Sequence, residues 1–363
     1  MTAKRTISFW SILVSMFIMF VLVGCSAEDA GSEEDASSDT KTTEEETTAD
    51  GGSDEETSDK YPIVIEHAFG ETVIEEKPER VATVQWNNHD IALALGVVPV
   101  GFSAANYGVQ DDSGMLPWTK EKLDELGAED PNIFQDTDGL DFEAVADSNP
   151  DVILAAYSGI KQEDYDILSE IAPVVAYNNG PWVTPWRDQV IINAKGMGME
   201  EEGKQLVEET DQFIEETASK YPEIQGKTVA FASISAEDLS QLYIYTPDDP
   251  RGKFLEELGM KYPESVLNEI KEDSGFSITV SAENADVLNG ADIIVSYGDA
   301  SLLETVQDDP LLGEIPAVKN GSVVFVGDAT PLAASLTPNP LSIRYTLDEY
   351  LKLLGEAAAV VNE

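Results

Sequence analysis

One stretch near the middle of the chain constrains its fold more than any other. Residues 184–221 are typical of a helix, a break at Gly196-Met197-Gly198 and a second, longer helix that Pro222 ends. Three glutamates at 200–202 fall in the first turn of the second helix, where the helix dipole favours negative charge. Its apolar residues recur at roughly helical spacing: Leu206, Val207, Phe213, Ile214 and Ala218.

Both flanks of this helical region carry short β-branched runs that alternate with short helices. We therefore predict an α/β fold in which one long α-helix joins two lobes, with a ligand cleft between them. The expected boundaries are 61–183 for the N-terminal lobe, 184–225 for the linker helix region and 226–363 for the C-terminal lobe. One larger α/β domain with a long crossover helix is the alternative.

Local signals predict further detail. Phe69-Gly70 joins two β-branched runs, which indicates a hairpin. Asn88 is expected to cap a helix from Asp90 to Leu95. In the second half, a helix is expected over 282–288, after a strand at 276–280.

The N-terminus indicates where the protein works. Lys4 and Arg5 precede an apolar run over 7–23, as in a secretory signal peptide. The run ends in Leu-Val-Gly-Cys at 22–25, which matches the lipobox of bacterial lipoproteins. We predict a signal peptide over 1–24 and a lipidated Cys25, against the alternative of a transmembrane anchor. The chain has a single cysteine, so no internal disulfide can form.

Residues 25–60 are expected to be a tether. The stretch is rich in Asp, Glu, Ser, Thr and Gly and has no aromatic residue. It cannot bury enough apolar surface to fold, and its like charges favour an extended chain.

The composition excludes several function classes. The chain has 70 acidic and 21 basic residues, a formal net charge of −49, which argues against nucleic acid and against adhesion of the folded part to anionic lipid. The two histidines are isolated, and with one cysteine they do not predict a metal site. There is no P-loop and no G-x-S-x-G motif, so we expect no enzyme and no catalytic residues.

Similar phrases occur in the two halves of the chain. The first half has RVATV, DIALALGVVPVGF and FEAVADSNPDVIL, and ENADVLNGADIIVSYG in the second half repeats the last of these. From Tyr61 to Glu363 the chain resembles the substrate-binding proteins of iron–siderophore ABC importers, whose wider family includes cobalamin and haem binders. The resemblance implies two Rossmann-like lobes with limited hinge motion, a ferric siderophore as ligand, and ABC permease subunits as partners.

Aromatic residues are the candidates for ligand contact. Several fall in predicted loops or at predicted strand ends, where open α/β sheets bind ligands, and aromatic rings offer broad contact to a bulky chelate. Packing in the core is the competing interpretation for each of them. The candidates are Trp86, Tyr107, Tyr157, Trp182, Trp186, Tyr243 and Tyr297.

Arginine is scarce, and this bears on the kind of siderophore. Arg187 and Arg251 are expected near the cleft, and Arg344 either faces it or caps the terminal helix. Anionic ferric catecholates and citrates call for a basic cluster, whereas neutral or cationic ferric hydroxamates suit aromatic rings with one or two arginines. We therefore favour a hydroxamate.

Two glutamates are implied as permease contacts by the resemblance. Binding proteins of this kind dock through one acidic residue on each lobe, and the matching positions are Glu143 and Glu283. The competing interpretation is the ordinary preference for Glu at the start of a helix.

The function expected from the sequence is ligand capture for import. The chain is predicted to be a monomeric lipoprotein on the extracytoplasmic face of the cell membrane, on a Gram-positive surface, and to need no cofactor besides its ferric siderophore ligand. Cobalamin or haem binding for import, and a non-transport sensor lipoprotein on the same fold, are the alternatives.

Overall fold

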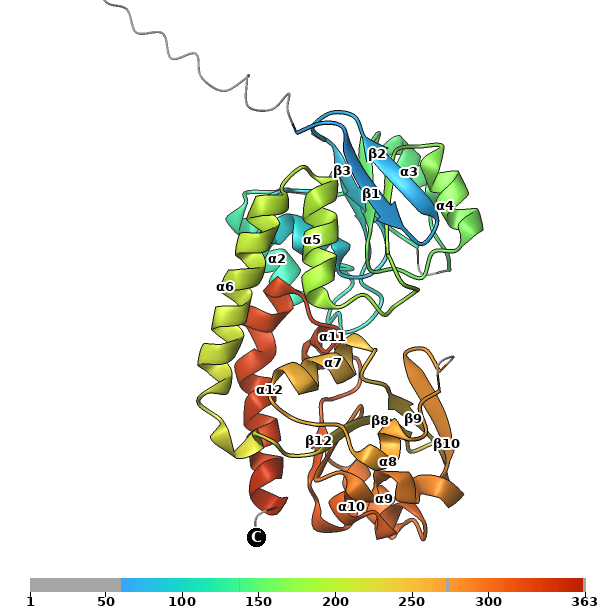
Figure 1. Ribbon diagram of the computed structural model, residues 1–363, viewed down its shortest axis with the longest axis vertical. Coiled ribbons are helices and arrows are strands. Elements are labelled where there is room, and N and C mark those ends of the chain that lie inside the picture. The colour runs from blue at the N-terminus through green and yellow to red at the C-terminus, as the bar shows by residue number, and fades with distance from the viewer. Residues whose placement is uncertain (1–59, 137, 272–273, 362–363) are drawn as a thin grey trace, which may run out of the picture. The chain divides into compact units, whose positions relative to one another are not determined.

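The computed structural model describes residues 60–136, 138–271 and 274–361 (Figure 1). The expected signal peptide, Cys25 and the tether up to residue 59 lie outside the described residues. Within the described parts of the chain, no helix is both long and apolar enough to cross a membrane.

Five parallel strands form the sheet of the first lobe, by which we mean β1–β7 with α1–α4. Their order is β5-β4-β3-β6-β7, so the chain adds strands on one side of β3 and then on the other. The buried strands are rich in Val, Ile and Ala, as expected of a parallel sheet covered on both faces. They are β3 (Val81–Thr83), β4 (Gly101–Ser103), β5 (Ile133–Phe134), β6 (Val152–Ala155) and β7 (Val174–Ala176).

The first lobe also contains the predicted hairpin and four helices. β1 (Ile63–His67) and β2 (Gly70–Ile74) pair antiparallel, which confirms the hairpin. The expected cap at Asn88 is wrong, because Asn87 occupies the N-cap with a φ of 65° and Asn88 is fully buried in the first turn. The helices are α1 (Asn88–Ala94), α2 (Pro117–Glu125), α3 (Phe142–Asp147) and α4 (Gln162–Ser169).

The helical region in the middle of the chain has the predicted form. α5 (Trp186–Gly196) ends before Gly198, whose φ of 68° is easy only for glycine, and α6 (Glu200–Ala218) follows. Ile214 on α6 is buried, and the other predicted apolar residues of this helix pack partly buried against the same core. The break therefore lies where the glycines were expected to place it.

The second lobe, by which we mean β8–β12 with α7–α11, repeats the architecture with a mixed sheet. The order is β10-β9-β8-β11-β12, in which β8, β11 and β12 are parallel and β9 and β10 pair antiparallel. As in the first lobe, the strand order reverses at one point, here between β8 and β11. The strands are β8 (Val229–Ser235), β9 (Asp238–Tyr245), β10 (Ser277–Ser281), β11 (Ile293–Ser296) and β12 (Val323–Phe325).

Short helices surround the second sheet. The expected helix at 282–288 is a 3₁₀ segment, η2 (Ala282–Gly290), with non-helical backbone at Asn284. The α-helices are α7 (Pro250–Glu257), α8 (Glu264–Leu267), α9 (Leu302–Asp308), α10 (Pro316–Asn320) and α11 (Pro331–Ser335). Two further 3₁₀ turns are η1 (Pro222–Ile224) and η3 (Leu312–Glu314).

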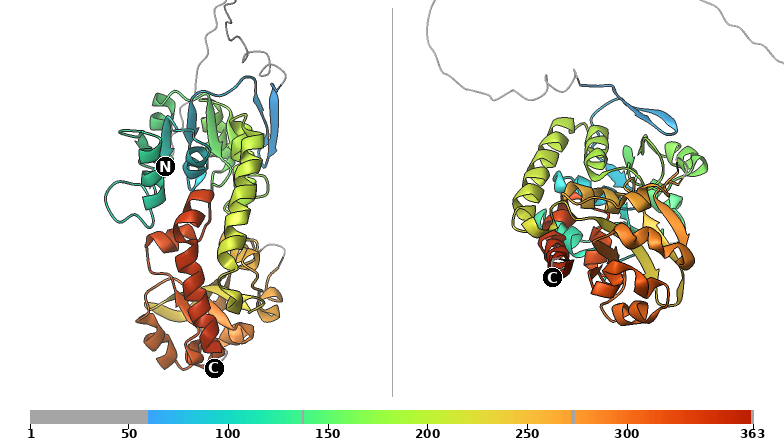
Figure 2. Two further views of the ribbon diagram at one scale, coloured as in Figure 1. Left: turned by 90° about the vertical axis from the view of Figure 1, so that its left-hand side faces the viewer. Right: turned by 60° about the horizontal axis from the view of Figure 1, so that its bottom comes forward.

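The last helix, α12 (Pro340–Val361), runs beside α6, as Figure 2 shows. It also contacts α1 and α2 of the first lobe, although its sequence was assigned to the C-terminal lobe. Ile343, Leu347 and Leu351 of α12 share one core with Ile214 of α6 and Phe231 of β8. Two helices, rather than α6 alone, therefore run along the connection between the lobes.

Candidate ligand-binding site

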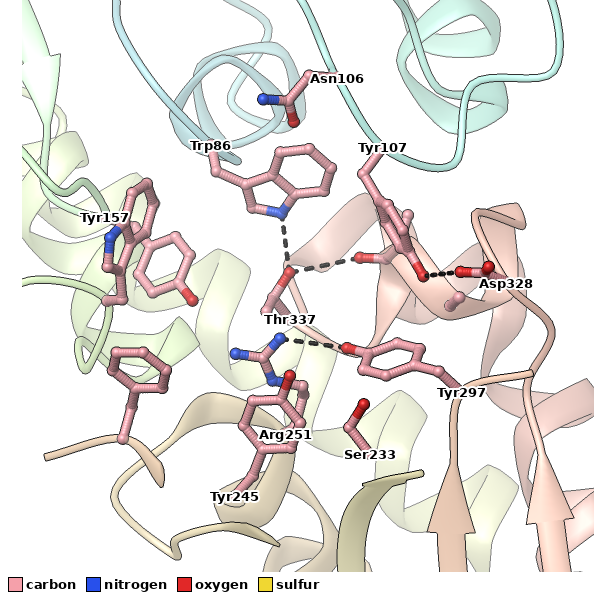
Figure 3. A pocket seen from close by; sticks show the side chains of 14 residues that line it. Trp86, Asn106, Tyr107, Tyr157, Ser233, Tyr245, Arg251, Tyr297, Asp328 and Thr337 are labelled. Atoms are coloured by element: carbon pink, nitrogen blue, oxygen red, sulfur yellow. Dashed lines mark hydrogen bonds between the residues drawn. The ribbon is translucent and has the colours of Figure 1, made fainter. Parts of the chain in front are cut away.

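A cavity of about 590 Å³ opens between the two lobes (Figure 3). This size suits a small ligand rather than a protein segment. Its lining residues come from both lobes and from the stretch before α12: Trp86, Asn106, Tyr107, Tyr157, Trp182, Ser233, Tyr245, Arg251, Phe276, Tyr297, Asp328, Ala333, Ala334 and Thr337.

The point where the strand order reverses in the first sheet supplies two of these rings. Trp86 follows β3 and Tyr157 follows β6, at the carboxyl ends of neighbouring parallel strands. Asn88 holds both loops, because its Nδ2 donates to the carbonyl oxygens of Trp86 (3.1 Å) and Tyr157 (2.9 Å). Its Oδ1 accepts from the Tyr157 amide (3.1 Å) and from Asn193 Nδ2 on α5 (3.0 Å). The residue expected to cap a helix therefore positions the site.

Trp182 closes the same wall beside Tyr157. The two rings meet edge to face with centroids 5.3 Å apart. A Cβ added at Gly159 would lie 2.5 Å from Trp182 Nε1, so this close approach requires glycine. Trp182 itself has a φ of 64°, an uncommon conformation for a bulky residue and a sign that its neighbours hold the loop in place.

Tyr107 connects the first lobe to the loop after β12. Its hydroxyl accepts from the Ala329 amide (3.0 Å) and donates to Asp328 Oδ1 (3.4 Å). Its ring lies edge to face with Tyr297, at a centroid distance of 6.2 Å. Burial raises the pKa of Tyr107 to about 12, so the phenol keeps its proton and can donate at neutral pH.

The second lobe contributes Arg251, Tyr245 and Tyr297, which form what we call the floor of the cavity. Tyr297 follows β11, next to β8, where this sheet reverses its strand order. The Arg251 guanidinium lies 4.0 Å from the Tyr245 ring centroid, and its Nη1 donates to the Tyr297 hydroxyl (3.2 Å). Rings from both lobes thus face a single arginine, an arrangement suited to a bulky ligand with oxygen acceptors.

Six of the ten predicted ligand-contact residues line the cavity: Trp86, Tyr107, Tyr157, Trp182, Arg251 and Tyr297. Four polar residues that line the cavity were not predicted from the sequence: Asn106, Ser233, Asp328 and Thr337. Small polar residues of this kind are common in loops throughout the chain, so composition alone offers no signal for them. Tyr245 and Phe276 could have been selected, because both are aromatic and lie at strand ends.

Trp186 and Arg187 are not in the cavity, contrary to expectation. Trp186 is 2% exposed within the core, and its Nε1 donates to Glu257 Oε2 (3.0 Å). Arg187 stacks over the Trp186 ring at 4.4 Å and pairs with Glu257 (2.6 Å) and Asp211 (3.0 Å). Both residues begin α5, and the direction of that helix turns them towards α6 and α7.

Tyr243 and Arg344 are also outside the cavity. Tyr243 is 47% exposed on β9, two residues before Tyr245, a shift of about 7 Å along the strand. Arg344 is exposed on α12, with its guanidinium 5.2 Å from the Phe213 ring of α6. Its helix position therefore directs it to the connection between the lobes.

The two glutamates proposed for docking are exposed and lie one on each lobe. Glu143 is in the first turn of α3, which Asp141 caps by accepting from the Ala144 amide. Glu283 is in the first turn of η2, which packs against α8. In Figure 1, α3 lies on the side of the first lobe away from α6. Both positions are open to a partner.

Neither histidine lines the cavity. His67 lies in the hairpin near Tyr165, and His89 is buried with its ring stacked 4.9 Å from that of Phe102. Among the described residues, no three His, Cys, Asp or Glu side chains are grouped to hold a metal ion.

Comparison with known proteins gives a family match and close structural likeness. The family model described as periplasmic binding protein matches residues 81–330. The crystal structure of PiaA from Streptococcus pneumoniae in complex with ferrichrome is 55% identical, with a TM-score of 0.80 over 82% of this chain and 99% of that one. The ferric enterobactin-binding periplasmic protein FepB of Escherichia coli is 28% identical, over 74% of this chain and 85% of FepB. The Fe(3+) dicitrate-binding periplasmic protein FecB of Escherichia coli is 25% identical, over 74% of this chain and 86% of FecB.

Proposed function

The chain belongs to the periplasmic binding protein family, and from this premise we propose that it captures a ferric siderophore of the hydroxamate type and delivers it to an ABC permease. The observation that carries the proposal is the cavity between the lobes, lined by rings from both sheets around one arginine. Broad apolar faces suit the bulk of a ferric chelate, and the arginine offers donors to its oxygen atoms.

The likeness to a ferrichrome complex supports the choice of ligand class. PiaA was crystallised with ferrichrome, a ferric hydroxamate, and is 55% identical to this chain over 82% of this chain's length. FepB and FecB, whose names specify ferric enterobactin and ferric dicitrate, are 28% and 25% identical. Haem is a weaker candidate because neither described histidine lines the cavity to bind its iron.

A binding titration tests this proposal. Trp86 and Trp182 line the cavity, so a coloured ferric chelate bound there should quench their fluorescence. The panel comprises ferrichrome, iron-free ferrichrome, ferric enterobactin, ferric dicitrate, haem and cobalamin, with calorimetry as an independent measure. We expect saturable binding of ferrichrome and weaker binding of its iron-free form. Binding of haem or cobalamin without any ferric siderophore would overturn the proposal.

We further propose that the mature protein is a monomer anchored in the cell membrane by a lipidated Cys25, on the extracytoplasmic face of a Gram-positive cell. The lipobox at 22–25 and the acidic stretch at 25–60 support an anchor followed by a tether. The proposed limits of the folded parts are 61–183, 184–225 and 226–363. With such a tether, the lobes could reach a permease without being held against the lipid surface.

Delivery is proposed to use Glu143 and Glu283. Their exposure and their placement on different lobes support a contact with two permease subunits. A movement of the lobes apart during release would break the hydrogen bonds that join Trp86 to Thr337 and Tyr107 to Ala329.

A further inference from the structure

Asp249 and Arg251 form a buried ion pair at the floor of the cavity, and only the arginine lines it. We propose that Asp249 is a specificity-determining residue, which neutralises Arg251 so that the cavity accepts uncharged ferric chelates and rejects anionic ones. This inference rests on the proposed siderophore-binding function and names the property of the site that selects the ligand class.

The contact is two-pronged and uses both carboxylate oxygens. Arg251 Nε donates to Asp249 Oδ1 and Arg251 Nη2 donates to Asp249 Oδ2, each at 2.7 Å. The Asp249 side chain is 0% exposed and that of Arg251 is 15% exposed. A pair with this geometry holds its charges together far more firmly than a solvated surface pair.

The backbone around Asp249 keeps the carboxylate in place. Asp249 caps α7, so Oδ1 also accepts from the Arg251 amide at 2.8 Å. The Asp249 amide in turn donates to the Thr246 carbonyl at 3.1 Å, and Pro250 fixes the backbone φ at the next residue. Because the cap and the ion pair share one carboxylate, Asp249 cannot turn away from Arg251 without breaking the start of the helix.

Tyrosine rings hold the other side of the guanidinium. The Tyr245 ring lies 4.0 Å from the guanidinium, and the Tyr297 hydroxyl accepts from Arg251 Nη1 at 3.2 Å. Burial by itself would lower the pKa of Arg251. The hydrogen bonds to Asp249, together with the nearby Tyr297 and Tyr157 hydroxyls, outweigh burial and raise this pKa above its ordinary value. Three of the five N–H groups of the guanidinium make the bonds named above, which leaves two that can donate to a ligand.

The charges around the cavity therefore do not favour an anion. Among the described residues, Arg251 and Asp328 are the charged ones that line it, and Asp328 is exposed. Adding the buried Asp249 gives one positive and two negative charges, a net of −1. An anionic ferric chelate would lose its hydration here without meeting an unpaired cation, whereas a neutral hydroxamate needs only hydrogen-bond donors for its oxygens.

Asp249→Asn tests the assignment with little change in shape. Asparagine is an equally good N-cap, so the start of α7 should persist while the net charge rises from −1 to zero. The ligands are ferrichrome, ferric enterobactin and ferric dicitrate, titrated by calorimetry. We expect the affinity for each anionic complex, relative to ferrichrome, to rise by at least about tenfold. Asp248→Asn is the matched control, because it removes an exposed charge one residue away and should leave this ratio within about twofold.

Two more variants show whether any gain depends on the arginine. In Asp249→Asn with Arg251→Gln the net charge returns to −1, and the ratio should return to the wild-type value. Arg251→Gln alone leaves Asp249 unpaired and should shift preference towards a cationic ferric hydroxamate, which keeps the inference testable if Asp249→Asn does not fold.

An unchanged ratio in a folded Asp249→Asn protein that binds ferrichrome would overturn the inference, as would a gain that persists in the double variant. Wild-type protein that binds no ferric hydroxamate would instead refute the proposed function, so the two failures are distinct.

Discussion

The indole Nε1 of Trp86 donates a 2.8 Å hydrogen bond to Oγ1 of Thr337. Trp86 follows β3 in the first lobe, whereas Thr337 lies about 250 residues later, between α11 and α12. Asn87 supports the contact by donating from Nδ2 to the Thr337 carbonyl, also at 2.8 Å. The Trp86 side chain therefore lines the cavity and also links the first lobe to the segment that leads into α12.

Replacement of Trp86 should weaken ligand binding in two steps. Trp86→Phe keeps a ring but loses the bond to Thr337, at a cost of about 1 kcal/mol in ferrichrome binding. Trp86→Ala also removes the contact surface and should cost about 1–3 kcal/mol in total. Calorimetric titration checks both values. Equal affinities for wild type and Trp86→Ala would contradict a ligand contact at this position.

Trp186 offers a matched contrast, because it is a tryptophan of the core. Trp186→Ala should lower the free energy of unfolding by about 3–5 kcal/mol, since it leaves a cavity and removes the hydrogen bond from the indole to Glu257 Oε2. Where the variant remains folded, its affinity for ferrichrome should stay within about twofold of wild type. Urea unfolding and calorimetry separate the two effects. Normal stability with lost binding would show instead that Trp186 contributes to ligand binding.

Charge reversal at the proposed docking residues should separate uptake from binding. Glu143→Lys and Glu283→Lys should leave ferrichrome affinity unchanged, because neither residue lines the cavity, and should reduce cellular iron uptake through repulsion at the permease. The double variant should be impaired more than either single one. Glu208→Lys, at an exposed acidic position on α6, is the control and should retain uptake. Normal uptake by the double variant would exclude this docking site.

His89 should make stability depend on pH. Burial lowers the pKa of His89 below its ordinary 6.5, although Asp90 and Asp136 oppose this. The unfolded chain therefore binds a proton that the folded chain resists, so stability falls as the pH drops below about 6.5. For one proton the slope approaches about 1.4 kcal/mol per pH unit.

Urea unfolding of wild type and His89→Gln between about pH 5.5 and pH 7.5 measures this contribution. The variant should show the shallower dependence on pH. The pKa of His67 is also lowered by burial, so the difference between the two proteins, rather than the wild-type curve, isolates His89. Parallel curves would exclude His89 as the source.

Loss of the thiol at Cys25 should abolish lipid attachment. In Cys25→Ser the protein should be released from the cell or remain bound through an uncut signal peptide, because only the thiol can form the thioether. Fractionation, with the mass of the mature protein, distinguishes these forms from the wild type. A variant that is processed and membrane-bound like wild type would refute the anchor.

The sequence by itself determined the fold class and the helical region in the middle of the chain. Helical spacing and the glycine break located α5 and α6, and the β-branched runs on both flanks predicted α/β structure on each side of them. These features depend on residues close together in the chain, so local patterns suffice to predict them. The ends of the strands also pointed to Trp86, Tyr157 and Tyr297, because ligands gather at the carboxyl ends of parallel strands.

Only the tertiary structure decided where individual side chains go. Trp182 and Trp186 are four residues apart, yet one lines the cavity and the other lies in the core, because α5 begins at Trp186 and turns this second ring towards α6 and α7. Asn88 positions Tyr157, which lies 69 residues away in the sequence, and Thr337 bonds to Trp86, which lies 251 residues away. Contacts over such separations depend on how the helices and sheets pack together, and no local pattern specifies that.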